Sequence, residues 1–85
     1  FSDQREARGG ADAARARPLV AAMVDQHRAL RAARQAPAGM APALRRHAGA
    51  AGAWVADRSR QLSESGREGT VLAAGMTATL TLNPS

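Results

Sequence analysis

The chain has 85 residues, of which 22 are Ala and 12 are Arg, and it contains no Lys, Ile, Tyr or Cys. This composition excludes a disulfide scaffold and a Cys-ligated metal site, and only 16 apolar residues other than Ala remain to build a core. The net charge of +5 comes entirely from Arg, which indicates either an anionic partner or the codon usage of a GC-rich genome. So short and Ala-rich a chain usually needs another chain to complete its core, so we expect a protein partner, the same or different.

Residues 1–17 are polar and charged and include two adjacent glycines, Gly9 and Gly10. We expect them to form a mobile basic arm. The first residue is Phe1 rather than Met, which we interpret as a sign that the chain is processed or is part of something longer.

Residues 18–36 are predicted to form an amphipathic helix, because Ala, Leu, Arg, Met and Gln dominate the segment. One side of this helix collects the larger apolar residues and His27, whereas Asp25, Ala29 and Ala32 fall on the opposite side. Pro37 and Gly39 end the helix.

A second helix is predicted from Pro42 to about Ser63, with Gly66 as its C-terminal stop. Its apolar positions recur at spacings of three, four and seven, as in helix-on-helix packing. Ala48, Gly52 and Ala56 are small residues spaced by four, which allow a second backbone to approach closely. Two helices of similar length joined by a short linker predict an antiparallel hairpin over residues 18–65.

Residues 66–85 are predicted to form a turn followed by a C-terminal strand or short hairpin of strands. From Met76 to Leu82, apolar residues alternate with threonines, and this period of two is typical of a half-buried strand. A lone strand is unstable in water, so we expect it to pair with another chain or with a segment absent from this sequence. The predicted fold class is therefore mainly α with one partner-dependent strand.

The predicted function is that of a non-catalytic accessory or structural subunit, which binds a protein partner through the helical apolar seam and by strand addition. The predicted contact residues are the large apolar residues of the helices and the apolar residues of the strand: Leu19, Met23, Leu30, Trp54, Val55, Met76, Ala78, Leu80 and Leu82.

Catalytic and metal sites find no support in the sequence. His27 and His47 are the only histidines, and two ligands are fewer than the three or four that zinc requires. No Ser lies in a strained nucleophile motif, and the seven carboxylates are scattered. We therefore predict no catalytic residue, no metal and no cofactor. A small subunit or fragment of a larger enzyme remains an alternative.

The first alternative, ahead of the enzyme subunit, is a basic structural component of a nucleoprotein assembly, such as a ribosome or a virus particle, because Arg pairs well with phosphate. Nucleic acid is therefore an alternative partner. The predicted anion contacts are Arg5, Arg8, Arg15, Arg17, Arg46 and Arg60. No apolar run is long enough to span a membrane, and the sequence leaves the compartment open.

Overall fold

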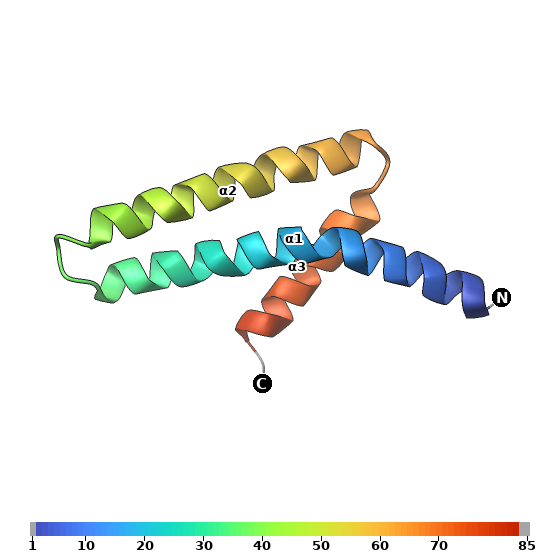
Figure 1. Cartoon of the computed structure of the whole chain (residues 1–85), viewed down its shortest axis with the longest axis horizontal. Coiled ribbons are helices and arrows are strands. Elements are labelled where there is room, and N and C mark those ends of the chain that lie inside the picture. Colours follow the sequence, from blue (N-terminus) through green and yellow to red (C-terminus); the bar gives the residue numbers. More distant parts are fainter. Residues whose placement is uncertain (1, 84–85) are drawn as a thin grey trace.

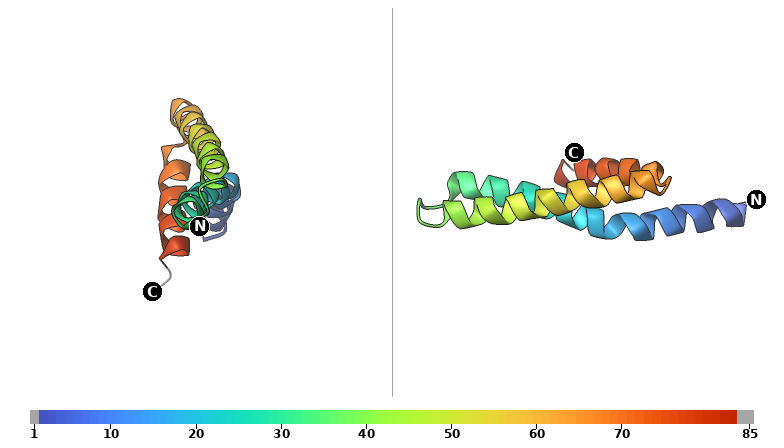
Figure 2. Two further views of the ribbon diagram at one scale, coloured as in Figure 1. Left: turned by 90° about the vertical axis from the view of Figure 1, so that its left-hand side faces the viewer. Right: turned by 90° about the horizontal axis from the view of Figure 1, so that it is seen from above.

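The computed structural model describes the backbone of residues 2–83 and the side chains of residues 13–83, and it folds into three helices (Figure 1). Helix α1 spans Ser2–Gln35, α2 spans Ala41–Glu64 and α3 spans Glu68–Leu82. The first two form the expected antiparallel hairpin. The third lies against one face of that hairpin and crosses α1 steeply (Figures 1 and 2).

The molecule is flat and elongated, with Cα extents of 55 × 32 × 13 Å. Its radius of gyration is 15.2 Å, whereas a compact domain of this length has a radius of gyration of about 12 Å. A plate this thin leaves most side chains within reach of solvent. The faces of its helices are therefore only partly covered by the chain itself.

Helix α1 extends well before the expected start at Pro18, and the residues expected to form an arm continue the same helix from Ser2. Pro18 stands inside the helix, and Figure 1 shows α1 bending in its blue half. A proline in a helix interior removes a backbone hydrogen bond and kinks the helix. The expected mobility of residues 1–17 stays a prediction.

Small residues form the hairpin interface near its loop. Ala29 and Ala33 of α1 are buried there, as are Ala41 and Ala48 of α2. The sequence placed Ala29 on the outer side of the helix and Leu30 on the inner side, and the structure reverses both, since Leu30 is 42% exposed. Two helices can approach closely when Ala rather than Leu faces the partner.

The close approach of the two helices is also visible at Gly52, one of the small residues predicted to permit it. A Cβ added there would lie 2.5 Å from the amide nitrogen of Gln26 on α1. Ala48 and Gly52 thus face α1 as expected, whereas Ala56 is exposed.

The connection between α2 and α3 is a glycine-terminated helix end. The backbone N–H of Arg67 donates to the carbonyl oxygen of Leu62 at 2.7 Å, and that of Gly66 donates to Ser63 at 3.1 Å. These two bonds define a Schellman motif, in which the residue after the helix adopts a left-handed conformation. Gly66 has φ = 75°, which explains why the predicted stop falls there.

The predicted C-terminal strand is wrong, because residues 68–82 form helix α3 and the described residues contain no strand. The hydroxyl groups of Thr79 and Thr81 donate to the carbonyl oxygens four residues earlier, both at 2.8 Å. These bonds give the threonine hydroxyl groups hydrogen-bond partners within the helix itself. A helix also bonds its backbone N–H groups to its own carbonyl oxygens, whereas a lone strand needs a neighbouring strand for these hydrogen bonds.

The same segment has a helical pattern that the alternation of Thr conceals. Thr70, Ala74 and Ala78 recur at intervals of four, and all three are at most 5% exposed. This row of small side chains lets α3 lie close to α1. Strand addition through residues 76–82 is therefore excluded as the way in which this chain meets a partner.

A cluster of buried apolar residues lies where the three helices meet. Ala16 and Leu19 of α1 pack there with Leu62 of α2 and Ala74 of α3. The partly buried residues around this cluster are Val20, Met23, Val55 and Val71. The two large apolar residues buried in this cluster are Leu19, which is 1% exposed, and Leu62, which is 5% exposed.

Candidate protein-interaction surface

The outer face of α3 carries an exposed apolar ridge formed by Leu72, Met76 and Leu80. These side chains are 68%, 68% and 70% exposed. They recur every four residues, so they line one side of the helix, opposite the buried row of small residues. A helix that is apolar on every side is normally covered on every side. In this structure α1 and α2 cover only one side of α3.

A hollow lies beside the ridge, and Gly75 is one of the residues that line it. Its volume is about 490 Å³. The hollow and the ridge share one surface, whose lining residues are Val71, Leu72, Gly75, Met76, Thr79 and Leu80. A Cβ built on Gly75 meets no atom within 4 Å, so the absent side chain leaves open space rather than making room for a neighbour in this chain.

Helix α3 also carries no charged side chain after its first residue. After Glu68 in the first turn, no charged side chain occurs before the end of the helix. The ridge and hollow are therefore an uncharged surface on an otherwise strongly basic chain.

The structure divides the predicted contact residues into three groups by their exposure to solvent. Leu19 and Ala78 are buried in the interior of the chain, at 1% and 5% exposure. The half-buried ones are Met23, Val55 and Leu82, of which the first two pack against the central cluster. The exposed ones are Leu30, Trp54, Met76 and Leu80. Of these exposed residues, Met76 and Leu80 lie together in one surface patch, on α3.

Sequence reasoning missed Leu72, which is as exposed as Met76, because the alternating pattern was taken to begin at Met76. The four-residue spacing of Leu72, Met76 and Leu80 was the signal that identifies the ridge. It also missed Met40, which is 60% exposed beside the hairpin loop.

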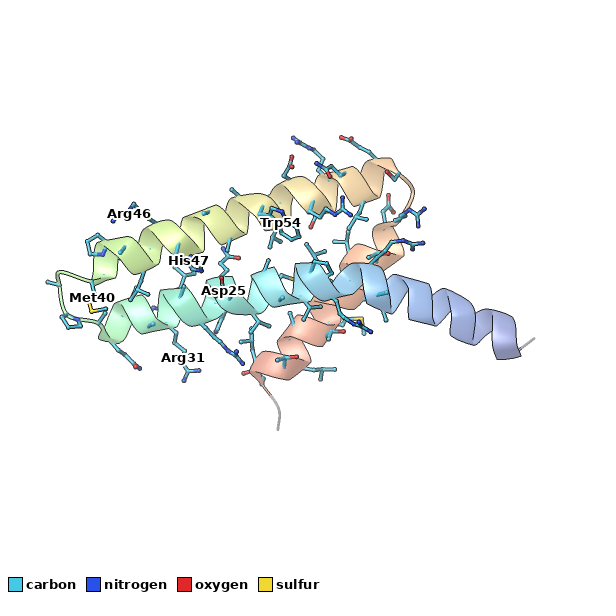
Figure 3. All side chains as sticks on the ribbon, in the orientation of Figure 1. Asp25, Arg31, Met40, Arg46, His47 and Trp54 are labelled. Atoms are coloured by element: carbon cyan, nitrogen blue, oxygen red, sulfur yellow. The ribbon has the colours of Figure 1, made fainter. Side chains whose placement is uncertain are left out.

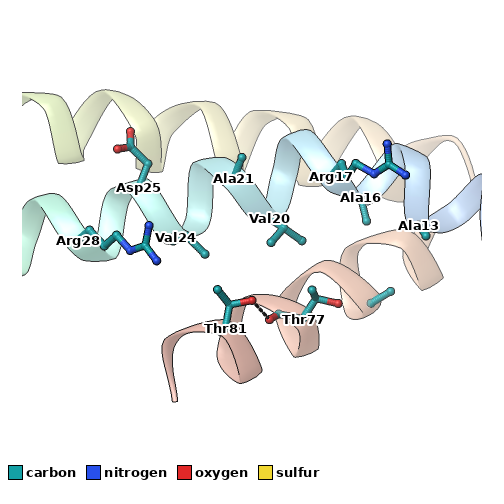
Figure 4. Close-up of a pocket in the computed structure, with 11 residues that line it drawn as sticks. Ala13, Ala16, Arg17, Val20, Ala21, Val24, Asp25, Arg28, Thr77 and Thr81 are labelled. Atoms are coloured by element: carbon teal, nitrogen blue, oxygen red, sulfur yellow. Dashed lines mark hydrogen bonds between the residues drawn. The ribbon is translucent and has the colours of Figure 1, made fainter. Parts of the chain in front are cut away.

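A larger groove of about 800 Å³ lies between α1 and α3. Figure 4 shows Val20 and Val24 lining it, with Arg17 and Arg28 at its two ends. Asp25 points away from α3, toward α2 (Figure 4). The groove is thus mostly apolar, with cationic ends.

The predicted anion contacts differ in what surrounds them. Arg60 is 2.5 Å from Asp57 and 4.0 Å from Glu64, so two carboxylates offset its charge. Arg17 and Arg46 are exposed. Arg15 borders a third hollow with Arg58 and Arg67, whereas the side chains of Arg5 and Arg8 lie outside the described residues.

The two histidines do not meet. The Nε2 atom of His47 lies 2.6 Å from Asp25 Oδ2, in a contact that joins α2 to α1, and both side chains are more than half exposed (Figure 3). His27 is exposed elsewhere on α1. Within the described residues, no three His, Asp or Glu side chains are grouped so as to hold a metal ion. None of the described helices is long and apolar enough to cross a membrane.

Comparison with known proteins gives no family to which these features can be referred: no family model matches the chain, and neither a curated protein nor a solved structure matches it.

Proposed function

We propose that this chain is a non-catalytic structural subunit that assembles with a second copy of itself through the outer face of α3. The observation that carries the proposal is the ridge of Leu72, Met76 and Leu80, which is about two-thirds exposed on an uncharged helix. Exposed apolar patches of this kind mark sites of protein association.

Self-pairing is supported by the shape of this face. It carries protruding side chains and, next to them, the hollow at Gly75, so one copy offers both a knob and a hole. Two such faces related by a two-fold axis present the same patch to each other, as isologous interfaces do. A glycine at the centre lets the two helix backbones approach closely.

Charge also favours a second copy of α3 as the occupant. Residues 26–56 carry five arginines and no Asp or Glu, so like charges would oppose association of two copies through that part of the hairpin. On α3, an antiparallel pair places the Arg67–Glu68 end of one helix beside the uncharged Asn83 end of the other. No pair of like charges therefore meets across the contact.

The expected dimer is modest in affinity. A single pair of helices buries less than the roughly 800 Å² per partner of a standard interface. We expect a dissociation constant in the micromolar range or higher, because burial of three large side chains per chain must offset an association cost of about 4–15 kcal/mol. The dimer should therefore form as the protein concentration rises.

The test is sedimentation velocity over a wide range of protein concentration. We expect the wild-type chain to form a dimer and Met76→Glu to remain a monomer, because a carboxylate would be buried against an apolar surface. Leu30→Glu is the matched control, since Leu30 is also an exposed apolar helix residue but lies away from the ridge. A wild-type monomer at every concentration, or a Met76→Glu variant that dimerises like the control, would refute the proposal.

A further inference from the structure

The positive charge of the chain is concentrated in one half of the hairpin. From residue 26 to residue 56 there is no Asp or Glu, and five arginines lie in this range. The other seven arginines are matched by seven Asp and Glu residues in the rest of the chain. The whole net charge of +5 therefore belongs to the end of the hairpin that carries the loop.

These five arginines, which we call the basic tip, lie within about two helical turns of the loop and are all exposed. They are Arg28, Arg31, Arg34, Arg45 and Arg46. Three stand in the last turns of α1 and two near the start of α2, whose first turn contains no acidic residue. Figure 3 shows Arg46 and Arg31 on opposite edges of the hairpin, so the charge surrounds the tip.

Nothing in the described chain neutralises the basic tip. At the opposite end of the hairpin, Arg60 pairs with Asp57 and Glu64. His47 of α2 pairs with Asp25 of α1. No ion pair among the described side chains involves an arginine of the basic tip. Unpaired guanidinium groups at one end of a thin plate create a local positive potential that attracts a polyanion.

We propose that the basic tip binds the phosphate backbone of nucleic acid without reading its sequence. Guanidinium groups pair with phosphate oxygens through two parallel hydrogen bonds, and such contacts supply most of non-specific affinity. Residues 28–46, which contain the five arginines, include no Asn to read base edges and no aromatic residue to stack on bases. Gln35 is the one amide side chain in this range.

An anionic membrane surface fits the basic tip less well. Binding in a membrane interface grows with the apolar area that enters it. The loop from residue 36 to residue 43 contributes Ala, Pro, Gly and a single large apolar residue, Met40. The arginines therefore outweigh the apolar part of the tip.

The magnitude follows from the number of phosphates that the tip can contact. With up to five contacts, log K should fall with log salt with a slope of up to about −4.5 on duplex DNA. That slope corresponds to a loss of roughly 500-fold in affinity between about 50 mM and 200 mM salt. Each arginine removed from the contact should lower the slope by about one.

The experiment measures binding of the full chain to a labelled duplex DNA of arbitrary sequence by fluorescence anisotropy at several salt concentrations. The test variant is Arg45→Gln with Arg46→Gln. The matched control is Arg58→Gln with Arg67→Gln, which removes the same charge at the opposite end of the hairpin. Both positions in each variant are exposed, so the fold should survive.

We expect the test variant to bind at least tenfold more weakly at low salt and to reduce the salt slope by nearly two, while the control changes the slope by less than one. Equal losses in both variants, no binding by the wild-type chain at about 50 mM salt, or binding to vesicles containing phosphatidylserine but not to DNA would overturn the proposal. The Met76→Glu variant should bind DNA through an intact tip, so failure of self-assembly and failure of DNA binding are distinguishable.

Discussion

Gly75 allows the stability of the single chain to be separated from its assembly. A glycine in a helix interior costs about 1 kcal/mol relative to Ala. A Cβ on Gly75 meets nothing within 4 Å, so Gly75→Ala places its methyl group in open space in the isolated chain. We therefore expect Gly75→Ala to stabilise the monomer by about 1 kcal/mol, which raises Tm by about 4–8 °C for a domain of this size.

Gly75→Leu extends the same test to the interface. Leucine also favours helix, so the monomer should again be at least as stable as the wild type. Its side chain, however, would project into the hollow of about 490 Å³ that the proposed interface needs for the facing side chain. We expect the dissociation constant of the dimer to rise by tenfold or more, since an overpacked contact costs about 1–3 kcal/mol.

The assays are thermal unfolding by circular dichroism at low protein concentration and sedimentation velocity at high concentration. The reasoning predicts opposite effects on the two: a more stable monomer and a weaker dimer. A Gly75→Leu variant that is destabilised as a monomer would refute the account of the open space at this position. One that dimerises as well as the wild type would refute the role of the hollow.

Other substitutions test the packing of the hairpin and the central cluster, each by the free energy of chemical unfolding. Gly49→Ala should stabilise the chain by about 1 kcal/mol, because no atom lies within 4 Å of the added Cβ. Gly52→Ala should stabilise it less, because the added Cβ would lie 2.5 Å from a glutamine amide that must move. Equal stabilisation by the two substitutions would show that α1 and α2 are not close at Gly52. Leu19→Ala should cost about 2–5 kcal/mol, since Leu19 is 1% exposed, and a cost below 1 kcal/mol would contradict the central cluster. Asp25→Asn combined with His47→Gln should cost less than about 1 kcal/mol, as expected for a pair more than half exposed, and a larger loss would show that this contact holds the hairpin together.

The hairpin could be predicted from sequence because its signals are local. Pro42 stands in the first turn of α2, and Gly66 adopts the positive φ of a helix end, both as expected. Such signals depend on backbone geometry within a few residues, so the remainder of the fold hardly changes them.

Helix α3 could not be assigned in this way because two periods coexist in its sequence. Alternating threonines indicate a strand, while Thr70, Ala74 and Ala78 at intervals of four indicate a helix with a row of small residues. The choice depends on the groove that α1 offers to this row, which is a tertiary contact that sequence patterns do not show. The same misassignment hid the ridge, because Leu72, Met76 and Leu80 become direct neighbours, each one turn from the next, only in a helix.

The faces of α1 were only partly predictable for a related reason. The larger apolar residues were placed against α2, and the structure turns Val20 and Val24 toward α3 while Ala29 and Ala33 face α2. With two neighbours rather than one, α1 needs two packed faces, and alanine serves well where backbones are close. The charge imbalance of the hairpin, in contrast, was present in the sequence and needed only the knowledge that residues 26–56 form one end.

The absence of Cys makes the most direct test of self-assembly simple, because an introduced Cys is the only thiol in the chain. Met76 lies at the centre of the ridge, so in an antiparallel pair of α3 helices its two copies lie closest to the two-fold axis, where a disulfide can form if the Cα atoms are within about 7 Å. The measurement compares the rate of oxidative cross-linking of Met76→Cys with that of Leu30→Cys at one protein concentration. The account predicts rapid formation of a covalent dimer through position 76 and slow formation through position 30, and equal rates at the two positions would contradict it.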